Sequence, residues 1–316
     1  MSRRPASVVV EPAAFGRRKA RAAAFSIASN LTLIALKLAA GIVTGSIAII
    51  TEAVHSSIDL VASVIAWFSV RKAEEPADEG HHYGHAKIEN VSAAIEGVLI
   101  LVGAGVIVYE SIRRLADPHG IEALGFGIAV IAFSGVANLA ISAYLYRQAR
   151  LTHSPALEGD AAHLRTDALT SFGVLLGLVL VEVTGAEALD PVAALLVAAA
   201  IIWAGARIVT GSLRVLVDET LPADELAEVR DVIERHSAPE IEGFHKLRAR
   251  RAGSRRYLDL HVQFRPGTTL ERAHEVAHEL QAGIQARLHE ADVLIHVEPS
   301  REGRDGIAKG VPHPDA

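Results

Sequence analysis

The sequence predicts an α-helical membrane protein with six transmembrane helices, arranged as two inverted three-span repeats and followed by a C-terminal α+β domain. Half of the 316 residues are hydrophobic and the mean hydropathy is +0.29, values that exceed those of an ordinary soluble domain. Charged residues nevertheless concentrate toward the end of the chain, and this asymmetry indicates a polar appendage to an apolar bundle.

Apolar stretches long enough to span a bilayer define the six predicted transmembrane helices. They cover residues 23–45, 46–70, 91–112, 121–147, 157–181 and 188–210. The N-terminal arm and the loops after the second, fourth and sixth stretches carry Lys and Arg, whereas the connections near 41–46 and 182–190 carry none. The positive-inside rule therefore predicts that both termini are cytoplasmic. Arg113 and Arg114, after the third stretch, depart from this rule, and they and Lys37, within the first stretch, are expected to extend toward the outer interface.

The resulting domain organisation has four parts. We expect a cytoplasmic basic arm over 1–22, the transmembrane domain over 23–212, a cytoplasmic domain over 213–300 and a disordered tail over 301–316.

A spaced pattern of polar residues occurs twice. Asn30, His55 and Asp59 recur 108 positions later as Asn138, His163 and Asp167. If each copy holds three spans, the odd number inserts the second copy upside down, as in the inverted repeats of secondary transporters, whose binding sites lie between the repeats.

The C-terminal part has the pattern of a small layered domain. A helical period follows Pro222, two alternating segments suggest paired strands around 244–253 and 255–267, and a second helix and a third strand follow, ending near Pro299. The predicted order is α-β-β-α-β.

Two His-x-x-x-Asp pairs, His55 with Asp59 and His163 with Asp167, lie inside apolar segments. A charged side chain at the bilayer centre costs about 3 kcal/mol, so four polar groups require compensation. Each pair occupies one helix face, and two facing pairs would offer two nitrogen and two oxygen ligands to a zinc-like ion. The alternative is a set of interhelical hydrogen bonds. The chain has no cysteine, which excludes disulfides and thiolate ligands.

A second candidate site lies in the predicted loop between the second and third spans. Asp78, His81 and His85 offer three ligands within eight residues, with His82 adjacent as a weaker candidate. The alternative is a solvated polar loop without a metal.

The C-terminal domain holds a third group. His245 and His261 fall on neighbouring strands, His296 and Glu298 share one face of the third strand, and His274 lies on the second helix. These residues can converge on a metal, although each histidine alone could equally be an ordinary surface residue.

From about residue 20 to 300 the chain resembles the cation diffusion facilitators, which are divalent-metal efflux transporters. The resemblance rests on the paired His-x-x-x-Asp motifs, on the loop DEGHHYGHAK, where His82 stands in place of the family's usual proline, and on the strand IHVEP. It implies that the paired motifs form the transport site, that the loop residues form a second site, and that the C-terminal histidines bind regulatory metal and help to join a homodimer. It also implies that Lys87 and Asp218 form a charge pair at the dimer centre. Glu298 departs from the aspartate of the best-known bacterial pattern.

The resemblance and the ligand chemistry together predict Zn(II)/H+ antiport by alternating access across the inner membrane of the cell. Cd(II), Co(II), Fe(II) and Mn(II) are the competing substrates. No enzymatic activity and no nucleic-acid partner are expected. Two other classes of protein fit the pattern less well: a membrane metalloenzyme would need an open coordination position, and a metal sensor with a membrane anchor would not need four polar groups in lipid.

Overall fold

The computed structural model describes two compact units that divide between Leu213 and Arg214, and each unit is considered by itself. The described residues are 12–44, 47–116, 125–186, 188–236, 238–288 and 290–300. The predicted tail over 301–316 and the first eleven residues of the predicted basic arm lie outside them.

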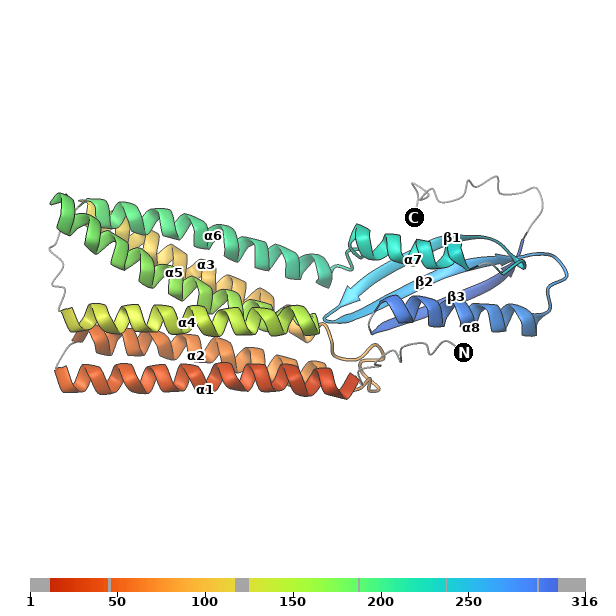
Figure 1. Ribbon diagram of the computed structural model, residues 1–316, viewed down its shortest axis with the longest axis horizontal. Helices are drawn as coiled ribbons and strands as arrows, with labels where there is room; N and C mark the ends of the chain where they lie inside the picture. Colours follow the sequence, from red (N-terminus) through yellow and green to blue (C-terminus); the bar gives the residue numbers. More distant parts are fainter. Residues whose placement is uncertain are drawn as a thin grey trace, which may run out of the picture. The chain divides into compact units, whose positions relative to one another are not determined.

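The first unit consists of six long helices that lie side by side (Figure 1). They are α1 (Pro12–Thr44), α2 (Ile47–Ala73), α3 (Ile88–Ala116), α4 (Gly125–Thr152), α5 (Pro155–Thr184) and α6 (Leu189–Leu216). α1 packs extensively on α2, and α4 on α5, so the helices that carry the two copies of the repeated pattern form equivalent pairs. α1 begins well before residue 23, because the basic segment of the predicted arm continues the helix.

The ends of α5 have sequence signals that fix its length. The side chain of Ser154 caps its N-terminus by accepting a hydrogen bond from the backbone N–H of Leu157, and Pro155 follows, where a missing N–H costs nothing. Gly185 ends the helix in the left-handed conformation, with φ of 72°.

Four of the helices contain segments long and apolar enough to cross a membrane. These segments are Gly16–Ala40 of α1, Ile88–Ala116 of α3, Pro155–Val181 of α5 and Leu189–Leu216 of α6. Within the described residues, α2 and α4 give no such segment.

Buried charges join several helices of this unit. Lys19 on α1 is buried and its Nζ lies 3.0 Å from a carboxylate oxygen of Glu74 and 3.0 Å from one of Glu89 on α3. The hydroxyl of Ser154 donates to the other oxygen of Glu89, which ties the N-terminus of α5 to the same group.

The prediction that Lys37 extends to the outer interface is wrong. Its side chain is 3% exposed, and its Nζ donates a hydrogen bond of 2.7 Å to the hydroxyl of Ser56 on α2. An acceptor inside the bundle replaces water for this ammonium group, so it has no need to reach the interface.

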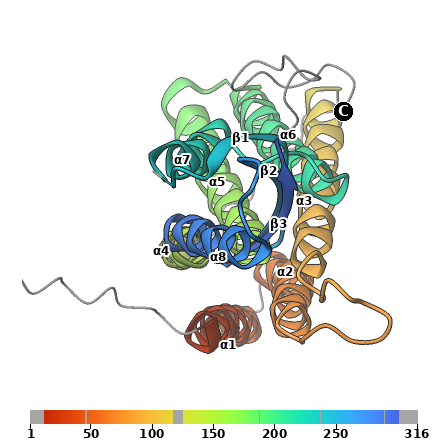
Figure 2. The same cartoon turned by 90° about the vertical axis from the view of Figure 1, so that its right-hand side faces the viewer.

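The second unit is a three-stranded sheet covered on one face by two helices (Figure 2). Its elements are α7 (Ala223–Arg235), β1 (Ile241–Ala252), β2 (Arg255–Phe264), α8 (Leu270–Arg287) and β3 (Ala291–Pro299). This order is the predicted α-β-β-α-β. β1 and β2 pair antiparallel, whereas β2 and β3 pair parallel because α8 carries the chain back along the sheet.

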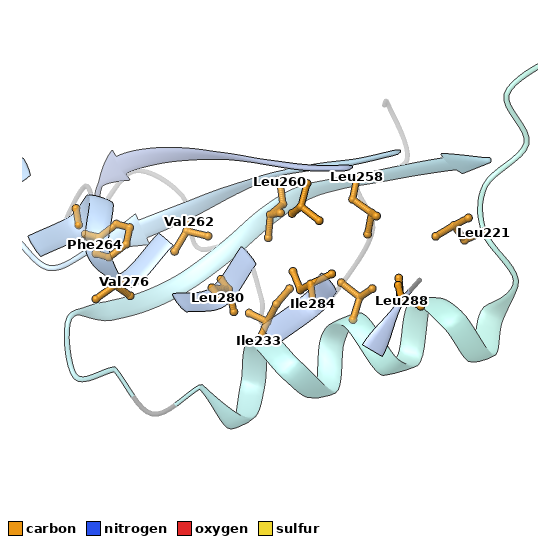
Figure 3. Close-up of a cluster of buried hydrophobic side chains, with 13 residues drawn as sticks. Leu221, Ile233, Leu258, Leu260, Val262, Phe264, Val276, Leu280, Ile284 and Leu288 are labelled. Carbon is orange, nitrogen blue, oxygen red and sulfur yellow. The ribbon is translucent and has the colours of Figure 1, made fainter. Parts of the chain in front are cut away.

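Alternation along β2 separates the apolar core from a polar face. Leu258, Leu260, Val262 and Phe264 are buried against side chains of α7 and α8, among them Ile233, in the cluster that Figure 3 shows. The intervening residues of β2 lie on the opposite face of the sheet, so a polar surface faces away from the helices.

Candidate metal centres

The helical unit brings together three of the four residues of the paired motifs. Nε2 of His163 on α5 lies 3.1 Å from Oδ1 of Asp59 on α2 and 3.9 Å from Oδ2 of Asp167. Asp59 and His163 are buried and Asp167 is half-buried. Ligands at ordinary bond lengths around a tetrahedral zinc stand about 3.4 Å apart. The spacing therefore suits one metal ion held by two carboxylates and an imidazole, and we call these three residues the bundle site.

The fourth residue of the paired motifs, His55, belongs to α2 one turn before Asp59. Its side chain lies outside the part of the chain whose side chains the structure describes. Its backbone position is compatible with a fourth ligand to the same ion.

Hydrogen bonds support the helices around the bundle site. Ser63, one turn from Asp59 on α2, donates to Oδ1 of Asp160 on α5 at 2.8 Å, and Asn30 on α1 donates to the hydroxyl of Ser63 at 2.8 Å. Asn138, the counterpart of Asn30, is also buried, but within the described residues its Oδ1 has no hydrogen-bond partner.

The loop between α2 and α3 assembles the second group. Oδ1 of Asp78 accepts hydrogen bonds from the backbone N–H groups of Gly80 and His81, at 2.9 and 2.7 Å, and lies 3.1 Å from Nδ1 of His81. Its Oδ2 lies 3.3 Å from Nε2 of His85, whose ring is buried. Gly84 adopts φ of 77°, which a glycine allows at little cost.

The surroundings of Asp78 favour the ionised form of its carboxylate. Desolvation raises its pKa, but the hydrogen bonds from His81 and Gly80 together outweigh that effect and hold the pKa below its usual value. His82 is exposed and stands outside the group of possible ligands, which consists of Asp78, His81 and His85.

The sheet of the second unit assembles the third group on its polar face. His245, His261 and His296 stand opposite one another across the three strands. Nε2 of His245 lies 2.6 Å from Oε1 of Glu298, and Nδ1 of His261 lies 3.2 Å from its Oε2. The ring of His296 packs against that of His261 with centroids 4.5 Å apart. His245, His261 and Glu298 have the spacing of metal ligands, whereas His296 stands beside this group and its role as a ligand stays a prediction; we call the three residues the sheet site.

Partial burial raises the pKa of Glu298, but hydrogen bonds from His261 and Gln263 and the charge of His245 lower it by more, so the net pKa lies below the usual value. A carboxylate kept ionised between two imidazoles is a suitable anionic ligand for a divalent cation.

Within this chain His274 lies apart from the sheet site, so its part in the metal sites of this domain stays a prediction. It lies on α8, whose buried residues cover the apolar face of the sheet, while the sheet site is on the opposite face. Its own neighbour is His278, with ring centroids 4.4 Å apart. Helical periodicity placed His274 correctly on α8 but could not tell which face of the sheet α8 would cover.

The predicted charge pair has one member with a partner inside its own unit. Asp218 follows α6 with φ of 61°, and its Oδ2 lies 3.0 Å from Nη1 of Arg250 on β1. Lys87 is half-buried and directly precedes α3. The Lys87–Asp218 pair stays a prediction.

Two carboxylates that are 0% exposed, Glu96 on α3 and Asp160 on α5, were not among the residues predicted from the sequence. Their signal is the one that revealed the paired motifs, an ionisable residue inside an apolar segment. Neither belongs to a His-x-x-x-Asp pair, so a search for a repeated motif passes over both.

Comparison with known proteins covers nearly the whole chain. Residues 23–217 match the cation efflux transmembrane domain, and residues 221–300 match the cytoplasmic domain of cation efflux proteins. An uncharacterized transporter of Synechocystis is 32% identical over 293 residues, which are 93% of this chain and 93% of the relative. The cation-efflux pump FieF of Serratia proteamaculans is 32% identical over 292 residues, 92% of this chain and 96% of the relative. FieF of Klebsiella pneumoniae is 30% identical over 286 residues, which are 90% of this chain and 94% of the relative.

These matches agree with an apolar helical unit that gathers candidate metal ligands and with a second unit built on a small mixed sheet. The family consists of integral membrane transporters of metal cations and not of enzymes. The chain belongs to the cation efflux, or cation diffusion facilitator, family.

Proposed function

We propose that this cation efflux transporter exports Zn(II) from the cytoplasm in exchange for protons, and that the bundle site, completed by His55, binds the ion. The observation that carries the proposal is the approach of Asp59, His163 and Asp167 from two helices within an apolar unit. A mixture of imidazole and carboxylate ligands suits Zn(II), with Cd(II), Co(II), Fe(II) and Mn(II) as competitors.

Proton exchange follows from the ligand types. Imidazole and carboxylate bind a metal only in their deprotonated forms, so protons and metal compete for the same site. If that site opens alternately to the two sides of the membrane, a proton gradient drives the metal outward. Six spans, related as inverted repeats and with both termini cytoplasmic, would place the site near the middle of the bilayer.

The other two groups fit supporting roles. The loop site, formed by Asp78, His81 and His85, would take up metal at the cytoplasmic surface. The sheet site would bind regulatory Zn(II) and strengthen a homodimer, because a cation offsets the repulsion between acidic groups of facing copies. The Lys87–Asp218 pair would contribute at the dimer centre.

Everted inner-membrane vesicles provide the test. Zinc uptake is measured with and without an imposed pH gradient, with the other four metals compared in parallel. Asp59→Asn and Asp167→Asn, which keep the side-chain volume and remove the charge, should abolish uptake while membrane insertion continues. Glu158→Gln, an exposed carboxylate in the first turn of α5, is the matched control and should transport normally. Normal zinc uptake by Asp59→Asn, or uptake that ignores the pH gradient, contradicts the proposal.

A further inference from the structure

Glu96 and Asp160 come together inside the helical unit, next to the bundle site but outside its group of possible ligands. Both are 0% exposed. The carboxyl group of Glu96 lies directly against Gly159, where an added Cβ would come within 3.1 Å of its Cδ. Since Gly159 precedes Asp160 in α5, the side chain of Glu96 reaches across from α3 to the immediate neighbour of the second carboxylate.

Hydrogen bonds offset only part of the free-energy cost of burying these two carboxylates. Within the described residues, the hydroxyl of Ser92 faces Glu96 and those of Ser63 and Ser26 face Asp160, but these groups are neutral and Oδ2 of Asp160 accepts no hydrogen bond. An ionised carboxylate removed from water costs several kcal/mol unless hydrogen bonds or a cation compensate it. Two adjacent carboxylates also repel each other when both are ionised.

No lysine or arginine pairs with either carboxylate in the described part of the chain. Asp160 is the charged group that faces Glu96, and α6 presents Val209 and Gly205 beside the neighbouring Gly97. Toward Asp160, α2 presents Ser63, and α1 presents Ser26 3.1 Å from the Ser63 hydroxyl.

Two ionisable groups on the surrounding helices could carry positive charge, and each has its own partners. His163 follows Asp160 on α5, and its Nε2 is directed to Asp59. The ammonium group of the buried Lys19 on α1 binds Glu74 and Glu89. The pair of Glu96 and Asp160 therefore has no cation of its own, because the charge that a protonated His163 exerts on Asp160 is shared with Asp59 and Asp167.

The missing positive charge can be a proton or a metal ion, and the donor set favours the proton. A metal ion needs three or four protein ligands, commonly with histidine among them. Within the described residues, the groups with metal-ligand spacing do not include Glu96 or Asp160. One carboxyl oxygen is enough to hold a proton, and the closed surroundings exclude the water that a partly hydrated metal would bring.

We propose that Glu96 and Asp160 form a proton-binding pair that is separate from the metal ligands. The inference rests on the metal/proton exchange proposed above. Asp160 precedes His163 by about one helical turn on α5, so a divalent cation at the bundle site adds positive charge close to the pair. That charge favours the ionised carboxylates, and the pair releases its proton as metal binds. The proton returns when the metal leaves, with no covalent or redox change.

Infrared spectroscopy of the purified full-length transporter observes the proton directly. At neutral pH the parent protein should show the carbonyl band of a protonated carboxylic acid, and zinc should diminish it. Glu96→Gln, which has the shape of the protonated acid, should lose that band. Glu110→Gln is the control, because Glu110 is a carboxylate on the same helix that is exposed beside Arg114. A parent without such a band overturns the proposal whether or not any variant folds.

Proton release gives the second measurement. Zinc is added to weakly buffered protein, and protons released per zinc bound are counted with a pH indicator. Glu96→Gln should bind zinc with the stoichiometry of the parent and release about one proton fewer, and Asp160→Asn should also release fewer. Equal release by Glu96→Gln and Glu110→Gln overturns the proposal. A variant that binds one zinc fewer per chain also overturns it, because the pair would then be a metal site.

The two proposals fail separately. A parent that shows the protonated band and releases its proton, but moves no zinc in vesicles, would refute antiport and leave the proton-binding pair. Transport with a parent-like pH profile in Glu96→Gln, together with an unchanged infrared spectrum, would refute the pair and leave antiport.

Discussion

The imidazole of His163 and the carboxylate of Asp59 meet at 3.1 Å although 104 positions separate them in the chain. One belongs to the first copy of the repeated motif and the other to the second, so the contact joins the two copies through α2 and α5. A site divided in this way depends on the packing of the helices, and small shifts between them change the distance between ligands.

The first prediction concerns metal selectivity. His55→Asp replaces a nitrogen ligand with an oxygen ligand, which makes the site harder and more anionic. Discrimination against Cd(II) should increase relative to Mn(II), measured as competition with zinc uptake in vesicles. His82→Asp introduces the same change at an exposed histidine outside the loop site and should leave the profile unchanged. An unaltered profile in His55→Asp would mean that His55 does not contact the metal.

The second prediction concerns the space occupied by Glu96. In Gly159→Ala the new methyl group would meet Cδ of Glu96 at 3.1 Å and Cα of Ala93 at 3.2 Å. Overpacking of this kind costs about 1–3 kcal/mol, so the thermal midpoint of the purified protein should fall. Gly103→Ala lies in α3, the helix of Glu96, meets nothing within 4 Å and serves as the control. Adding Glu96→Ala to Gly159→Ala should recover part of the loss, because the two changes share one contact. If the losses in thermal midpoint are strictly additive, the two substitutions do not share a contact.

The third prediction concerns the buried ion pair of Lys19. Lys19→Met leaves Glu89 buried without its cation, which should cost about 3–5 kcal/mol and lower the thermal midpoint strongly. Lys72→Met removes a lysine whose pair with Glu75 is solvent-exposed, and its cost should stay at about 0–1 kcal/mol. Similar effects from the two substitutions would mean that the Lys19 pair is hydrated in solution.

The fourth prediction concerns the acid stability of the second unit, expressed alone as residues 214–300. Its own hydrophobic core supports independent folding. Because the pKa of Glu298 lies below its ordinary value of 4.5, its contribution to stability is complete above that value. It is lost as the pH falls through the lowered pKa. Glu298→Gln should therefore lower the midpoint at neutral pH and reduce the loss of stability in acid.

Adding zinc to the same isolated domain tests whether the sheet site binds metal. A ligand that binds only the folded form raises the thermal midpoint, so zinc should stabilise the parent domain more than Glu298→Gln. Asp292→Asn, an exposed carboxylate on the same strand, should respond to zinc as the parent does. If zinc stabilises neither the parent nor the control, the sheet site is not a metal site.

Much of this architecture follows from periodicity and spacing. Apolar segments locate the long helices, and the alternation of apolar and polar residues along β2 separates Leu258 and Leu260 from His261 in the sequence itself. The positions of the Lys37 and His274 side chains do not follow in this way, because each depends on a partner distant in sequence. Lys37 finds a hydroxyl on another helix, and His274 is placed by the face of the sheet that α8 covers.

The register of the sheet determines both which residues of the second unit enter its core and which histidines stand side by side on its polar face. His261 stands opposite His245 on one side and His296 on the other, while its neighbours Leu260 and Val262 enter the core. Insertion or deletion of a single residue within β2 would exchange the two faces beyond that point. Imidazoles would enter the apolar layer and leucines would replace them among the prospective ligands. A change in the length of this strand would therefore disturb the core and the candidate ligands together, whereas a substitution can alter one face alone.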